Sequence, residues 1–186
     1  MDTFDSATVL FTDMVGFTKI ASRVSAEELI VMLNRMFSEF DKLAEKHGVE
    51  KIKTIGDAYM AVAGVPIPNE FHAEAVADMA LDIMQSIKDL AEKENLPIMI
   101  RAGIHTGYLT AGVIGEKKFA YDLWGDTVNT ASRMESSGEA GRVQCSETTY
   151  QALKDTFDFE ERGTIEVKGK GAMKTYFLLG RKNSTQ

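Results

Sequence analysis

The stretch Ile52–Met60, IKTIGDAYM, has the pattern of two short strands joined by a tight turn. The apolar residues that alternate on the two sides of the turn are Val49, Ile52, Ile55, Ala58, Met60 and Val62. Glycine permits the backbone conformation of a hairpin turn, and aspartate commonly accompanies it. A hairpin does not require a lysine inside a β-prone strand. Lys53 and Asp57 therefore need an explanation beyond turn chemistry.

The segments around this hairpin predict the order of the other elements. ATVLFTD (7–13) is a β-branched apolar run typical of a buried strand, and Ser25 with Glu28 forms a capping box that opens a helix to about Lys46. A second amphipathic helix is predicted from about 72 to 94, followed by strands over 98–106 and 109–115 with a turn at Gly107. This order predicts an α+β fold, with an antiparallel or mixed sheet and two helices on one face.

The second half of the chain predicts shorter elements than the first. It predicts a short strand at 121–124, a helix over 127–137 with Asp126 as its N-cap, a strand at 143–146 and a short helix at 146–153. A terminal hairpin over 157–179 holds the loop VKGKGAMK.

Composition limits the classes of function. The chain has 186 residues, 44% hydrophobic and 26% charged, which is typical of one globular domain. The net charge of −7 disfavours binding of long nucleic acids but allows a single nucleotide. No membrane span or signal peptide is predicted, and one cysteine excludes an internal disulfide, so we expect a reducing, cytoplasmic setting.

Two aspartates are candidates for a metal site. Asp13 ends a buried strand, where a carboxylate is costly without a cation, and the glycine-containing turn after it offers backbone N–H groups for phosphate oxygens. Asp57 lies beside Asp13 if the hairpin pairs with the first strand. Two such carboxylates suit Mg²⁺ bridged to phosphates. The alternative interpretation is that each aspartate caps a turn.

Several cationic and polar residues are candidates for nucleotide contacts. Asn129 and Arg133 share one helix face, which suits phosphate binding but is equally typical of a solvated face. Lys168 lies in a glycine-flanked loop that resembles a phosphate clamp. The evidence for this role is weaker, because exposed loops of this kind are frequent. Arg101 lies inside an apolar strand, where an unpaired guanidinium is costly, and this predicts an anionic partner. The three histidines and Cys145 show no metal-ligand spacing or nucleophilic machinery.

Taken together, the chain resembles the catalytic domain of the class III nucleotidyl cyclases. The motifs that carry the resemblance, in the family's order, are FTDMVGFT, KTIGDAYMAV, RAGIHTG, YDLWGDTVNTASRMES and VKGKG. The resemblance spans about residues 8–180 and implies a ferredoxin-like sheet-and-helix core with a small C-terminal α/β subdomain. It also implies that residues 1–186 are a single catalytic domain, part of a larger protein whose regulatory domain lies elsewhere and which can be membrane-attached.

The resemblance implies a role for each candidate residue in an antiparallel homodimer with shared active sites. Asp13, Asp57 and the backbone carbonyl of Met14 would hold two Mg²⁺ or Mn²⁺ ions, and Phe17 and Thr18 would bind the triphosphate through the backbone, with Arg101 on the same phosphates. The partner chain would supply Lys53 and Asp122 to the purine, Asn129 to the ribose, Arg133 to the pentacoordinate phosphorus and Lys168 to the outer phosphates. On this interpretation Lys53 and Asp57 serve different active sites.

The implied reaction is attack of the ribose 3′-hydroxyl on the α-phosphorus, with release of pyrophosphate. Lysine donates and aspartate accepts, as adenine N1 and N6 require, whereas guanylyl members of the family usually carry Glu and Cys or Ser at these positions. The sequence therefore predicts an adenylyl cyclase that makes cyclic AMP from ATP. The alternatives are a guanylyl cyclase acting on GTP and an inactive cyclase-like regulatory domain. Asp13 or water is the proton acceptor, and the sequence does not distinguish them.

Overall fold

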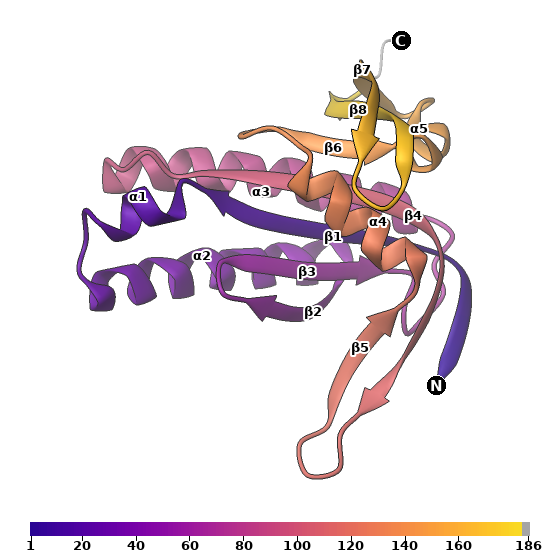
Figure 1. The fold of residues 1–186 in the computed structure, drawn as a ribbon, viewed down its shortest axis with the longest axis horizontal. Coiled ribbons are helices and arrows are strands. Elements are labelled where there is room, and N and C mark those ends of the chain that lie inside the picture. Colours follow the sequence, from indigo (N-terminus) through magenta and orange to yellow (C-terminus); the bar gives the residue numbers. More distant parts are fainter. Residues whose placement is uncertain (184–186) are drawn as a thin grey trace.

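The computed structural model describes residues 1–183, which form a mixed eight-stranded sheet with helices on both faces (Figure 1). The strands are β1 (Asp2–Val15), β2 (Glu50–Ile55), β3 (Ala58–Ala63), β4 (Met99–Ile114), β5 (Ala120–Trp124), β6 (Val143–Ser146), β7 (Phe157–Val167) and β8 (Gly171–Arg181). The helices are α1 (Phe17–Ala21), α2 (Ala26–His47), α3 (His72–Glu94), α4 (Asp126–Ser136) and α5 (Glu147–Leu153).

The sheet has the order β2-β3-β1-β4-β6-β8-β7, and β5 pairs with β4 outside this path. All neighbours are antiparallel except β4 and β6, which are parallel. The first six major elements are strand, helix, strand, strand, helix and strand, which is the ferredoxin-like pattern. The predicted α+β fold, with its mixed sheet and added C-terminal part, is confirmed.

Helices α2 and α3 cover one face of the sheet, as their apolar spacing predicts (Figure 1). The capping box of α2 is present: Glu28 N donates to Ser25 Oγ at 3.1 Å, and Ser25 N donates to Glu28 Oε2. Gly48, at φ 69°, ends the helix in the left-handed conformation that glycine adopts without strain. Phe40 of α2 packs edge-on against Tyr59 of β3, with ring centroids 5.3 Å apart.

The opposite face of the sheet packs against α4. The apolar residues buried there include Val9, Val62, Leu109 and Ala131. Gly103 of β4 lies directly under α4, since a Cβ on it would be 2.0 Å from Glu135 N. Helix α4 therefore sits on the sheet at a distance that only a glycine allows.

Two local predictions are wrong. Gly107 makes no turn, because β4 runs without a break from Met99 to Ile114. Its missing side chain instead makes room for Thr127 of α4, whose Oγ1 would be 2.6 Å from a Cβ. Asp126 is the first residue of α4 and not its N-cap, which is Gly125 and makes no side-chain cap.

The first strand and the segment after it also differ from the prediction. Strand β1 begins at Asp2, well before the predicted 7–13, because its first residues pair with the far end of β4. The turn expected after Asp13 contains the short helix α1, which Gly16 opens at φ 71°. The predicted hairpin is present as β2 and β3, with Gly56 at φ 59° in the turn.

Buried hydroxyl groups link two histidines through the interior. The members of this hydroxyl chain, between His72 and His105, are Thr8, Thr106, Thr149 and Ser146. The successive heavy-atom distances from His72 Nδ1 to His105 Nδ1 are 2.7, 2.9, 3.0, 3.4 and 2.6 Å. Burial of so many hydroxyls is tolerable because each has a partner.

Candidate active site

Asp13 and Arg101 form an ion pair across the two central strands. They are direct neighbours in the register of β1 and β4. Arg101 Nη2 donates to Asp13 Oδ2 at 2.8 Å, and Nε donates to Oδ1 at 3.2 Å. This confirms the anionic partner predicted for Arg101 and makes the pair bidentate, which is the stronger arrangement. The hydrogen bonds from Arg101 to Asp13 raise the pKa of the guanidinium.

The hairpin places Asp57 beside this pair. Strand β3 runs next to β1, with Thr12 opposite Tyr59, so the turn before β3 reaches the end of β1. Asp57 Oδ2 accepts a hydrogen bond from Met14 N at 2.9 Å. The predicted pairing of the hairpin with the first strand, which brings Asp57 to the Asp13 end, is confirmed.

Glu135 of α4 adds a third carboxylate, which sequence reasoning missed. Its Oε2 lies 3.4 Å from Arg101 Nη2 but makes no hydrogen bond, although the atom is buried. Burial, and then the charge of Asp13, raises the pKa of Glu135 to about 8. The signal was available in the sequence, because Glu135 falls one helical turn after the apolar Ala131, where an acid needs a partner.

The donor set fits divalent cations. Asp13 and Asp57 lie near a single guanidinium, while the raised pKa of Glu135 favours its neutral form, so an excess of negative charge remains in a partly buried place. Within residues 1–183 no group of three or more His, Cys, Asp or Glu side chains is arranged to hold an ion by itself. Two carboxylates and a carbonyl are nevertheless what Mg²⁺ needs when substrate phosphates and water complete its shell.

Lys53 and Asp122 form a second charged pair. Lys53 Nζ donates to Asp122 Oδ2 at 2.8 Å, from β2 to β5. The other oxygen, Oδ1, accepts from Leu123 N at 2.8 Å. The structure thus brings together the two residues predicted to read the purine, and it gives Lys53 and Asp57 different partners. No hydrogen bond or ion pair within residues 1–183 links this pair to the Asp13–Arg101 pair.

The remaining predicted residues lie on α4, on α1 and in the β7–β8 turn. Asn129 is exposed and Arg133 half-buried, one helical turn apart. Lys168 is exposed at the tip of the turn. Phe17 and Thr18 begin α1, so their backbone N–H groups precede the first helical hydrogen bonds, which end on Gly16 O.

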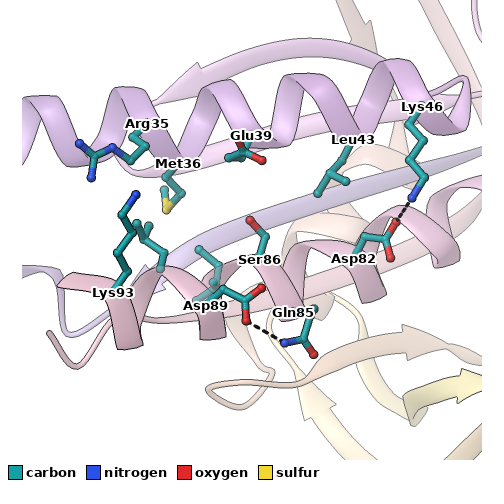
Figure 2. A pocket seen from close by; sticks show the side chains of 12 residues that line it. Arg35, Met36, Glu39, Leu43, Lys46, Asp82, Gln85, Ser86, Asp89 and Lys93 are labelled. Atoms are coloured by element: carbon teal, nitrogen blue, oxygen red, sulfur yellow. Dashed lines mark hydrogen bonds and ion pairs between the residues drawn. The ribbon is translucent and has the colours of Figure 1, made fainter. Parts of the chain in front are cut away.

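A separate groove lies between α2 and α3 (Figure 2). Two polar contacts join side chains that line it: Lys46 Nζ lies 3.3 Å from Asp82 Oδ2, and Gln85 Nε2 donates to Asp89 Oδ1 at 3.0 Å. None of the residues that line it is a predicted site residue. The groove lies among the helices that cover the other face of the sheet from α4, and we assign no catalytic role to it.

Residues 1–180 match the sequence profile of the adenylate and guanylate cyclase catalytic domain. The chain belongs to this cyclase family. The cyclase domain of Catenaria anguillulae RhGC, a guanylate cyclase domain solved in complex with GTP, is 43% identical and superimposes with a TM-score of 0.93 over 98% of this chain and 100% of that one.

Curated cyclases of both specificities are similar to this chain. An adenylate cyclase of Mycobacterium tuberculosis is 49% identical over 181 residues, and the guanylate cyclase soluble subunit beta-2 of Rattus norvegicus is 50% identical over 185. The matches cover 97% and 98% of this cyclase domain but only 41% and 27% of those proteins. Within residues 1–183, no helix combines the length and apolar character needed to cross a membrane.

Proposed function

We propose that this cyclase domain converts ATP into 3′,5′-cyclic AMP and pyrophosphate. The observation that carries the choice of ATP is the Lys53–Asp122 pair, whose donor and acceptor lie 2.8 Å apart. Lysine only donates and suits adenine N1, whereas the carboxylate only accepts and suits the N6 amine. Guanine presents the opposite polarity at both positions. A mismatch would leave buried polar groups unpaired, which disfavours the wrong base by orders of magnitude.

In the proposed reaction the ribose 3′-hydroxyl loses its proton to Asp13 or to water, its oxygen forms a bond to the α-phosphorus, and the bond from that phosphorus to the oxygen bridging to the β-phosphorus breaks, which releases pyrophosphate. Asn129 orients the ribose, and Arg133 donates to the oxygens of the pentacoordinate phosphorus. Lys168 holds the outer phosphates, where negative charge grows as pyrophosphate leaves. Arg101 uses three of its five N–H groups on Asp13 and Ser136 O, which leaves two to donate to phosphate oxygens.

Asp13, Asp57 and the Met14 carbonyl are the groups proposed to hold two divalent ions, Mg²⁺ or Mn²⁺. When bound, the ions would supply positive charge to the triphosphate and to the attacking oxygen. The backbone of Phe17 and Thr18 binds the triphosphate beside them. The carboxylates of Asp13 and Asp57 beside one guanidinium support this assignment, because the cluster is short of positive charge even with Glu135 neutral.

We propose a homodimer with shared sites as the active form. Lys53 and Asp122 form one charged group and Asp13, Asp57 and Arg101 another, with no bond between them among the described residues. Large apolar side chains are exposed on the hairpin and on the β4–β5 extension: Ile55, Val113, Ile114 and Phe119. A second copy of the chain would cover such residues and bring the two groups together. We include in the proposal that residues 1–186 are one catalytic domain, regulated by other parts of a longer protein.

The proposal is tested by measuring kcat/KM for ATP and for GTP with the purified dimer, with Mg²⁺ and with Mn²⁺. We expect ATP to be preferred. A value for GTP equal to or above that for ATP would support the guanylyl alternative, for which the 50% identical rat relative is an argument. Absence of product with either nucleotide in folded, dimeric protein would indicate an inactive cyclase-like domain.

The double substitution Lys53→Glu with Asp122→Cys probes the base directly. It exchanges donor for acceptor at one position and removes the acceptor at the other. We expect the preference to move towards GTP. An unchanged ratio of the two kcat/KM values would contradict the role of this pair in base selection.

A further inference from the structure

The turn between β7 and β8 carries two lysines with different environments. Lys170 N donates to Val167 O at 2.9 Å, and Gly169 between them has φ 78°, as in a type II turn. This turn leaves Lys168 exposed at its tip, while the side chain of Lys170 is only 24% exposed. The two lysines therefore have separate roles.

Lys170 is held by the first residue of α4. Its Nζ donates to both Oδ1 and Oδ2 of Asp126, each at 2.6 Å. Asp126 is itself favoured at this place, because a carboxylate in the first turn interacts well with the positive end of the helix dipole. The Asp126–Lys170 pair thus attaches the turn to the start of α4, and Figure 1 shows the β7–β8 turn reaching over this helix.

The attachment joins two elements that would have to act on one nucleotide. Helix α4 carries Asn129 and Arg133, and the turn carries Lys168. Among the ion pairs of residues 1–183, the Asp126–Lys170 pair is the one that links this turn to α4. Val167, at the start of the turn, is buried, whereas Lys168 and Gly169 at its tip are exposed, so the ion pair is the polar contact that holds the tip to α4.

We propose that Lys170 is a positioning residue, whose ion pair with Asp126 fixes Lys168 relative to Asn129 and Arg133. This inference rests on the proposed role of Lys168 in binding the outer phosphates. In this proposal Lys170 acts through Asp126, which engages two of its three ammonium hydrogens, and not through the substrate. A misplaced catalytic group can cost up to about a hundredfold in rate, so even a mobile turn matters.

The test is a double-mutant cycle on the full chain, with kcat and KM measured for the nucleotide that it cyclises. We expect Lys170→Met and Asp126→Asn each to lower kcat by about tenfold and to change KM by less than about threefold. In a Lys168→Met background, the added Lys170→Met change should cost nothing more, because Lys170 acts only through Lys168. Lys174→Met, at an exposed position on β8, is the matched control and should leave kcat unchanged.

The proposal would be overturned if the loss of kcat in the double variant Lys168→Met, Lys170→Met equalled the product of the losses in the two single variants. Such independence would mean that Lys170 acts on the substrate by itself. An Asp126→Asn variant with unchanged kcat would overturn it as well. The reversed pair, Asp126→Lys with Lys170→Asp, should recover most of the lost rate. Failure of this rescue in a variant with unchanged melting temperature would also contradict the positioning role.

Hydrogen exchange separates this inference from the proposed function. The amide of Lys170, bonded to Val167 O, should exchange roughly tenfold faster or more in Asp126→Asn and Lys170→Met, with β1 and β4 unaffected. If the unmodified chain cyclises neither nucleotide, the proposed function fails, and exchange at the turn still decides whether the ion pair holds it. Unchanged exchange would show that the pair does not fix the turn.

Discussion

Among the histidines, His105 is the one whose pKa is most strongly shifted by its place in the fold. It lies on β4 with Nδ1 2.6 Å from Ser146 Oγ. Burial lowers the pKa of His105 to about 4, although Asp126 nearby acts in the opposite direction. Burial also lowers the pKa of His72 at the other end of the hydroxyl chain. Both imidazoles are therefore neutral in the folded protein at neutral pH.

We predict an acid-sensitive fold between about pH 6.5 and 4 because of His105. The unfolded chain takes up a proton at the ordinary pKa of His105, near 6.5, whereas the folded protein resists it until about 4. The stability contributed by neutral His105 is thus present above pH 6.5 and is lost as the pH falls through this window. The loss amounts to up to about 3 kcal/mol.

Urea unfolding of the unmodified chain and of His105→Asn across this pH range checks the prediction. Asparagine keeps a polar group near the position of Nδ1 but does not titrate. The variant should lose less stability on acidification than the unmodified chain. Parallel curves for the two proteins would show that His105 does not cause the acid sensitivity.

Among elements, α4 depends most on its contact with β4. A Cβ on Gly103 would be 2.0 Å from Glu135 N and 2.5 Å from Met134 C, which are backbone atoms that cannot move aside independently. We predict that Gly103→Ala destabilises the fold by about 3 kcal/mol or more, since overpacking against backbone displaces the whole helix. Cyclase activity should also fall, because α4 carries Asn129 and Arg133.

Gly180→Ala is the matched control for this prediction. Gly180 lies in β8, a Cβ added to it would have no neighbouring atom within 4 Å, and its backbone does not need positive φ. We expect its effect on the free energy of unfolding to stay within about 0.5 kcal/mol. Chemical denaturation of both variants gives the comparison, and equal midpoints would contradict the close packing of α4 on β4.

Some elements could be predicted from the sequence, and others could not. The spacing of apolar residues predicts α2 and α3, and the hairpin chemistry predicts β2 and β3, because these patterns are local. The prediction at Gly107 is wrong because glycine signals a turn as readily as a close approach, and only the position of Thr127 distinguishes the two. The pattern on α4 marks Glu135 as an acid that needs a partner, but neither that partner, Arg101, nor the pairing of Lys170 with Asp126 can be read locally, because these residues lie far apart in the chain.

For the whole molecule, the central prediction is that active sites are shared between two chains. If one chain supplies Asp57 and the other Arg133, Asp57→Ala and Arg133→Ala homodimers should each be nearly inactive. In a mixed dimer both lesions fall in one site, and the second site is intact. Random exchange of chains would restore roughly a quarter of the wild-type sites.

Mixing the two purified variants and measuring cyclic nucleotide formation gives the answer. Sites contained within one chain would give no recovery, since each would keep its lesion. A control mixture of Asp57→Ala with Asp13→Asn should stay inactive, because both changes affect the same half of the site. Recovery in that control would show that the proposed division of residues between the chains is wrong.

The hydroxyl chain between His72 and His105 has a consequence for tautomerism. Each hydroxyl has one hydrogen, so a fully bonded chain runs in a single direction from one ring to the other. If His72 Nδ1 donates to Thr8, each hydroxyl donates onward and Ser146 donates to His105 Nδ1, which leaves the His105 proton on Nε2. In the reverse direction the two assignments exchange. Rings on α3 and β4 thereby hold complementary tautomers, and nitrogen chemical shifts of the two imidazoles should change together when either ring is altered.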